Sequence, residues 1–114
     1  YGTEYGLDGD HDPGCRKVMP WDPAQQDQDM HAFVKALIAL RHRYNDWIIQ
    51  GQIDYEALDN GVKISLTHQG LRLVAYFNHE GSLKIDQPAK LCLANGYQEN
   101  CLGPDGLIIY EEEV

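Results

Sequence analysis

The chain has 114 residues, of which 18 are acidic and 9 are basic, so its formal charge at pH 7 is −9. This charge argues against nucleic acid or an anionic membrane surface as the main partner. With 43% hydrophobic residues and no apolar run as long as a membrane span, the composition is that of a soluble globular protein. We expect one small core and no deep enzyme cleft.

The cysteines and the N-terminal residues favour a cytoplasmic location. No basic segment followed by an apolar segment marks a secretion signal near Tyr1. Three irregularly spaced cysteines, Cys15, Cys92 and Cys101, suit reduced thiols better than a disulfide framework. A Cys92–Cys101 bond stays open, because the sequence does not show whether the two Cβ atoms meet.

The first part of the chain is predicted to be a long loop followed by one helix. Glycine and proline recur throughout residues 1–26, which leaves no uninterrupted stretch for a regular element. From Asp27 to Tyr44 apolar residues recur three and four positions apart, which predicts an amphipathic helix. Asp27 is its expected N-cap, and Asn45 with Asp46 its expected end.

After Trp47 the hydrophobic period changes to two, which predicts short antiparallel strands. The strands are expected within residues 53–57, 62–66, 71–77, 83–85, 90–93 and 107–111. The third of them should be central, because both of its faces carry apolar residues. Turns are expected at 59–61, 69–70, 86–88, 95–96 and 103–106. The predicted fold class is mainly β: a small antiparallel β-sandwich preceded by a long loop and one amphipathic helix.

The helix suggests two domains. Its apolar stripe must pack on something, whereas a β-sandwich with its own filled core does not need it. We therefore expect residues 1–45 to be the end of one domain and residues 46–114 to be a complete β-sandwich domain.

The metal motifs of the loop are incomplete. Asp8, Asp10 and Asp12 alternate as in a calcium loop, but the glycine and glutamate that an EF-hand requires are missing, so a solvated acidic loop is favoured. His11 and Cys15 alone cannot complete a zinc tetrahedron. Nucleophile and phosphate-loop motifs are absent from the sequence. We predict no metal and no cofactor.

Asp12 and Arg16 are the candidate binding residues. A carboxylate and a guanidinium four positions apart could together hydrogen-bond vicinal sugar hydroxyls. Trp21 could stack on a sugar or fill the interior of the loop. The alternative is that the Asp12–Arg16 pair only connects the loop to itself.

Several segments of the sequence, at residues 1–7, 11–17, 19–22 and 73–78, resemble the α-amylase family of glycoside hydrolases. Residues 1–7, Tyr-Gly-Thr-Glu-Tyr-Gly-Leu, resemble the stretch after the family's eighth barrel strand. Residues 11–17 and 19–22 resemble the loop that follows, above all in the neopullulanase, cyclomaltodextrinase and maltogenic amylase branch. Residues 73–78 resemble an apolar strand of the family that ends in asparagine. Thr3 departs from the pattern, since many members have aspartate there.

The resemblance implies the C-terminal part of a retaining glycosidase that hydrolyses α-glucosidic bonds of maltodextrins, cyclodextrins or pullulan. Residues 1–45 would end a (β/α)8 barrel, and residues 46–114 would be the C-terminal β-sandwich domain that stabilises it. Asp12 and Arg16 would contact glucose units of a maltooligosaccharide or cyclodextrin. The family's nucleophile and acid lie on earlier barrel strands, so no catalytic residue is expected in this chain, which alone should hydrolyse nothing.

Two further expectations concern partners. The alternative function is a stand-alone carbohydrate-binding or protein-interaction module, in which Trp47, Tyr55 or Tyr76 forms a sugar platform. Without a barrel, the helix would expose apolar residues such as Phe33 and Leu37. Self-association through the helix, or folding of the helix onto the sandwich, is therefore expected.

Overall fold

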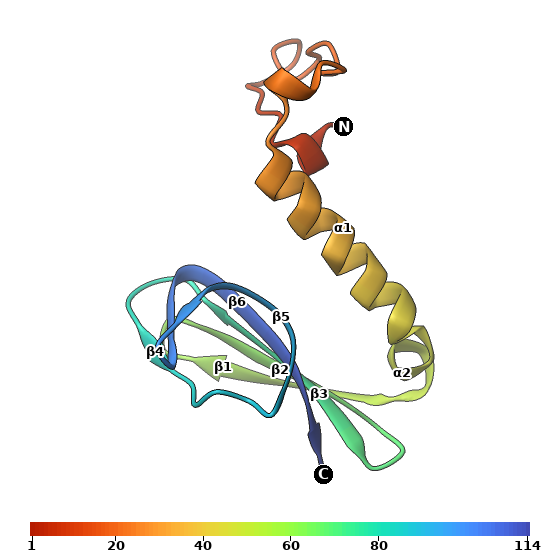
Figure 1. Ribbon diagram of the computed structural model, residues 1–114, viewed down its shortest axis with the longest axis vertical. Helices are drawn as coiled ribbons and strands as arrows, with labels where there is room; N and C mark the ends of the chain where they lie inside the picture. The colour runs from red at the N-terminus through yellow and green to blue at the C-terminus, as the bar shows by residue number, and fades with distance from the viewer. The chain divides into compact units, whose positions relative to one another are not determined.

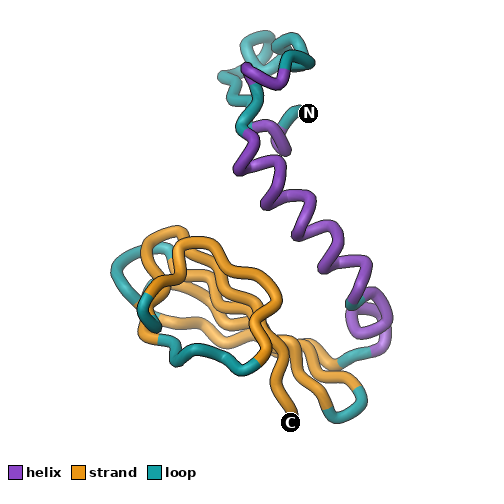
Figure 2. The backbone as a smooth tube through the Cα atoms, viewed as in Figure 1, coloured by secondary structure: helices purple, strands orange, loops and turns teal.

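The computed structural model describes residues 1–114, which form two compact units, Tyr1–His42 and Arg43–Val114. Figure 1 labels the helices and strands, and Figure 2 shows that every strand follows the helices in the chain. The elements are two 3-10 helices (Thr3–Tyr5, Pro23–Gln25), α1 (Gln28–Arg43), α2 (Asn45–Gln50), β1 (Gln52–Leu58), β2 (Gly61–His68), β3 (Leu71–Asn78), β4 (Leu83–Lys84), β5 (Lys90–Gln98) and β6 (Cys101–Glu113). The mainly β class is confirmed. Neither α-helix combines the length and the apolar character needed to cross a membrane.

The first unit is an irregular segment followed by α1. The backbone N–H of Asp27 donates to the carbonyl of Tyr5 at 3.1 Å, and the ring of Tyr5 stacks on His31 with centroids 4.8 Å apart. Asp27 Oδ1 accepts from the backbone N–H of Met30 at 2.9 Å, which confirms the predicted N-cap. No residue of α1 is buried. The chain does not leave helical structure at Asn45 as expected, because α2 starts there.

The six strands form one antiparallel sheet in the order β1-β2-β3-β6-β4, with β5 paired to β6. The predicted central strand is confirmed, since β3 lies between β2 and β6 and Val74 is fully buried. Ile85, Leu102 and Ile108 form the core cluster, and side chains of β3, β4 and β5 pack around it. Thus the core gathers residues from the C-terminal half of the second unit.

β1 lies at the edge of the sheet and pairs only with β2. Six of its seven residues are exposed. Ile53 and Tyr55 are exposed by 50% and 69%. Asp54 and Glu56 alternate with them and point to the opposite face of the strand. The edge therefore combines an apolar side with an acidic side.

The turns expected at residues 95–96 and 103–106 are wrong. β5 continues to Gln98 and β6 begins at Cys101, so both segments lie inside strands. The hairpin turn lies instead at Glu99 and Asn100, whose φ angles are 50° and 62°. Two consecutive residues in the left-handed region give a turn whose twist matches that of the strands, and asparagine tolerates that region better than most residues.

Glycines in β5 and β6 allow these two strands to pack closely against each other. Gly96 has a φ of 74°, and a Cβ built on it would lie 3.3 Å from the Cα of Gly106. A Cβ on Gly106 would lie 2.7 Å from a side-chain carbon of Leu102. The register between β5 and β6 also shifts between Asn95 and Tyr97. These glycines therefore permit a bulge and close approach of two strands, where composition indicated turns.

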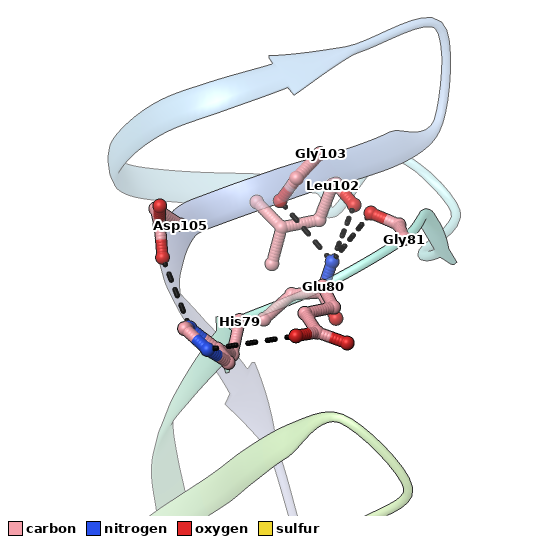
Figure 3. Close-up of polar contacts among 7 residues, drawn as sticks. His79, Glu80, Gly81, Leu102, Gly103 and Asp105 are labelled. Carbon is pink, nitrogen blue, oxygen red and sulfur yellow. Dashed lines mark hydrogen bonds and ion pairs between the residues drawn. The ribbon is translucent and has the colours of Figure 1, made fainter.

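Asn78 is the only buried polar residue of the chain, with 4% of its surface exposed. Its side-chain Nδ2 donates to the carbonyls of Gly81, Leu102 and Gly103 at 2.9, 3.2 and 3.1 Å, and Figure 3 shows these carbonyls converging on one nitrogen. At Leu102 strand β6 pairs with β4, whereas from Gly106 onward it pairs with β3. Asn78 thus holds the site where β6 changes its partner.

His79 adds further bonds beside Asn78. Its backbone N–H donates to the carbonyl of Asn60 at 2.7 Å, and its carbonyl accepts from the N–H of Asp105 at 3.3 Å. The ring Nδ1 lies 3.2 Å from Asp105 Oδ1, as Figure 3 shows. Asp105 has a φ of 54°, so these contacts hold a residue whose backbone is in the left-handed region.

Tyr44 anchors the start of the second unit. It is 3% exposed, and its hydroxyl donates to Glu111 Oε2 at 2.7 Å. Lys90 Nζ donates to the other carboxylate oxygen of Glu111 at 2.5 Å, and Cys92 Sγ lies 3.5 Å from the Tyr44 hydroxyl. The hydrogen bonds from Lys90 and Tyr44 lower the pKa of Glu111. The segment before α2 is therefore bonded to the last strand.

We expect Asn78→Asp to lower the free energy of unfolding by at least about 2 kcal/mol, because a carboxylate of the same shape would face three carbonyls without a donor. Urea unfolding of the purified chain measures the change. Asn95→Asp, at an exposed position of β5, is the matched control and should stay within about 0.5 kcal/mol of the wild type. Equal midpoints for the two variants would contradict the assigned role of Asn78.

Tyr44→Phe should destabilise the chain by about 1–2 kcal/mol at pH 7, since the partly buried carboxylate of Glu111 loses a hydrogen bond. Because the folded-state pKa of Glu111 is lowered, its contribution is present above the pKa of the unfolded state and is lost as the pH falls through the folded-state pKa. Stability of Tyr44→Phe should therefore fall less steeply in acid than that of the wild type. Thermal unfolding from pH 7 to pH 3 tests this, with Tyr55→Phe as the exposed control. Parallel curves for Tyr44→Phe and wild type would contradict it.

Candidate functional site

Asp12 and Arg16 form a two-point ion pair in the N-terminal loop. Arg16 Nε lies 2.7 Å from Asp12 Oδ1, and Arg16 Nη2 donates to Asp12 Oδ2 at 3.2 Å. Two turn hydrogen bonds position them: Gly14 N–H to the carbonyl of His11 at 2.7 Å, and Arg16 N–H to the carbonyl of Pro13 at 2.9 Å. The structure thus brings together the two residues that the sequence singled out.

The pair remains open to solvent. The side chains of Arg16 and Asp12 are 72% and 61% exposed. A guanidinium has five N–H donors, so three remain free when two contact Asp12. Each oxygen of Asp12 keeps a further lone pair. The pair therefore offers fixed donors and acceptors side by side, as two adjacent hydroxyl groups require.

A second ion pair lies in the same loop as Asp12 and Arg16. Lys17 Nζ lies 2.6 Å from Asp8 Oδ1, and this contact lowers the pKa of Asp8. The Tyr1 hydroxyl donates to the carbonyl of Lys17. Asp8 therefore pairs with Lys17, whereas Asp12 pairs with Arg16. The chain contains no cluster of three or more His, Cys, Asp or Glu side chains that could hold a metal ion.

Of the three aromatic residues proposed as sugar platforms, Trp47 and Tyr76 pack against neighbouring side chains, whereas Tyr55 is 69% exposed. Trp47 packs edge-on against Tyr44 with centroids 5.0 Å apart. Tyr76 stacks on Tyr110 at 6.4 Å, and Lys63 Nζ lies 5.5 Å from the centroid of the Tyr76 ring. In the loop, Trp21 is 77% exposed, so it does not fill the loop interior.

The cysteines are all free, so Cys92 and Cys101 do not form a disulfide.

A cavity of about 440 Å³ was not predicted from the sequence. It lies in the second unit and is lined by Leu71 and by residues 88–90 and 110–113. Among its lining residues only Pro88 had been singled out in the sequence, as part of a predicted turn.

Curated proteins with similar sequences come from one group of enzymes, although no family model matches the chain. Intracellular maltogenic amylase of Bacillus subtilis is 39% identical over 103 residues, 81% of this chain and 18% of that enzyme. A cyclomaltodextrinase of Bacillus sp. is 54% identical over 44 residues, which cover 39% of this chain and 8% of the enzyme. Neopullulanase 2 of Thermoactinomyces vulgaris is 46% identical over 43 residues, 38% of this chain and 7% of the enzyme.

This chain resembles a short part of α-amylase-family enzymes. It spans less than a fifth of the length of these relatives. Solved structures show the same fold: cyclic alpha-maltosyl-(1→6)-maltose hydrolase of Arthrobacter globiformis superposes with a TM-score of 0.73 over 100% of this chain and 25% of that one, at 23% identity. Maltogenic amylase of S. marinus gives a TM-score of 0.73 over 99% of this chain and 16% of that one, at 24% identity.

Arg16→Ala should leave the stability of the chain within about 0.5 kcal/mol of the wild type, because an exposed ion pair contributes little to folding. Urea unfolding at low and high salt measures this. Glu111→Ala, which removes the partner of Lys90 and Tyr44, should be clearly destabilising in the same assay. If Arg16→Ala instead lowered the free energy of unfolding by about 2 kcal/mol or more, the loop would need the pair for folding. Such a loss approaches that of breaking a buried ion pair.

Proposed function

We propose that this chain is the C-terminal part of a retaining glycosidase that hydrolyses α-glucosidic bonds of maltodextrins, cyclodextrins or pullulan. Residues 1–45 would complete the catalytic barrel, and residues 46–114 would form the domain that stabilises it. The proposal is supported by the 39% identity to intracellular maltogenic amylase over 81% of the chain. The observation that carries it furthest is the solvent-facing Asp12–Arg16 pair.

In this proposal the chain binds substrate and does not cleave it. A retaining glycosidase uses two carboxyl groups about 5–5.5 Å apart, one as nucleophile and one as acid. Both would come from barrel strands outside the 114 residues. Asp12 would accept from two hydroxyls of a glucose unit, while Arg16 holds that carboxylate and donates to the same ring. The free donors and acceptors of the pair support these roles.

The proposed substrate and location agree with the charge and the cysteines. A neutral glucan suits a chain of charge −9, which would repel anionic ligands. Three free thiols suit a reducing cytoplasm, where the Bacillus subtilis relative is named as intracellular. The stand-alone binding module has less support, since Trp47 and Tyr76 are packed against neighbouring side chains. Self-association through α1 stays a prediction.

A chimera tests the proposed function. Residues of this chain would replace the matching 18% of Bacillus subtilis maltogenic amylase. In that enzyme we expect Arg16→Ala to lower kcat/KM for maltotriose by about 10- to 100-fold, because charge-assisted hydrogen bonds to the sugar are lost. Lys17→Ala, in the same loop but paired with Asp8, is the control and should stay within about twofold of the parent.

Three results would contradict the proposal. A folded chimera without activity would show that this chain cannot replace the segment it resembles. Unchanged kcat/KM in Arg16→Ala would remove the binding role of the loop. Release of glucose or maltose by the 114-residue chain alone would overturn its non-catalytic role.

A further inference from the structure

The cavity beside Tyr110 is a candidate binding site in the second unit. Its volume of about 440 Å³ falls within the range of about 300–1,000 Å³ of small-molecule sites. We propose that it binds one or two glucose units of an α-glucan, as an accessory site made by other residues than Asp12 and Arg16. This inference rests on the proposed function for the class of its ligand.

The walls of the cavity suit the C–H faces of a sugar ring. The lining residues include the aromatic Tyr110 and the apolar Leu71, Pro88 and Ala89. Tyr110 is held in place by stacking on Tyr76, with an angle of 18° between the rings. A mainly apolar pocket with a few fixed polar groups is the usual form of a small-molecule site.

The polar groups of the rim are fixed before any ligand arrives. Lys90 Nζ contacts Glu111 Oε1 at 2.5 Å, and Arg72 Nη1 contacts Glu112 Oε1 at 3.1 Å. An ammonium keeps further N–H donors beyond one ion pair, and a carboxylate keeps further lone pairs. A ligand therefore meets oriented donors and acceptors, which reduces the entropy lost on binding.

Tyr110, one of the lining residues, carries a hydroxyl that interacts with the side chain of Tyr76. Burial and the adjacent Tyr76 raise its pKa to about 12. The hydroxyl thus stays protonated at neutral pH, where it can both donate and accept hydrogen bonds.

The charges around the cavity select a neutral ligand. Three consecutive glutamates, residues 111–113, line it, and the whole chain carries −9, so phosphorylated or carboxylated ligands are disfavoured. Glu111 and Glu112 already pair with Lys90 and Arg72, so a cationic ligand would meet only Glu113 as an acidic partner without an ion pair. A neutral polyhydroxyl compound is not repelled by the glutamates and does not need an unpaired carboxylate.

Residue-resolved NMR titration of the 114-residue chain with maltotriose tests the site. We expect saturable backbone shift changes at residues 88–90 and 110–113, with a dissociation constant in the millimolar range. Ala89→Trp, which fills the cavity, should weaken binding at least tenfold. Ala57→Trp, at an exposed position of β1, is the matched control and should bind like the wild type.

Tyr110→Phe gives an independent measurement if Ala89→Trp does not fold, because it keeps the stacked ring and removes only the hydroxyl; it should weaken binding at least threefold. The shift changes should persist in Arg16→Ala. Shift changes confined to residues 12–16 would overturn the accessory site and leave the proposed function standing. Absence of saturable shifts at the cavity, or equal binding of cellotriose, would also overturn it. Failure of the chimera would instead count against the proposed function.

Discussion

The second unit depends on one side-chain amide. Asn78 places a single nitrogen among three carbonyls that belong to the connection after β3 and to the start of β6. Buried carbonyls without a donor would cost free energy, and here β6 leaves β4 for β3. At this interruption in strand pairing the Asn78 side chain supplies a hydrogen-bond donor to three carbonyls. The long β6 can then pair with three strands and carry much of the core.

Polar contacts of the chain fall into two groups with different consequences. Asn78 and Tyr44 are buried, and their hydrogen bonds fix the path of the backbone. Asp12 and Arg16 are exposed, and their ion pair adds little to folding while it keeps donors and acceptors directed at solvent. This contrast in burial supports the proposal that the loop binds a ligand while the sheet provides support.

Sequence periodicity predicted the elements whose side chains alternate regularly between environments. The helix follows from apolar residues three and four positions apart and its cap from Asp27, while the central strand around Val74 follows from apolar residues on both of its faces. The pairing of Asp12 with Arg16 followed from a separation of four residues across a proline turn.

Other features could not be read from local sequence. Gly96 and Gly106 look like turn residues, but their role is set by two strands that approach closely. Asn100 gave little signal, although it forms the hairpin turn. The cavity beside Tyr110 brings together segments about twenty residues apart, so only the folded chain shows it.

The edge strand β1 has a consequence for the behaviour of the protein in concentrated solution. Its outer backbone groups are free to pair with another strand, the usual route to sheet extension and fibre growth. Two copies of β1 aligned antiparallel about Tyr55 would place Asp54 directly opposite Glu56, and like charges at such positions repel. The alternating carboxylates thus act as a barrier to polymerisation, and salt, which screens them, would weaken that barrier.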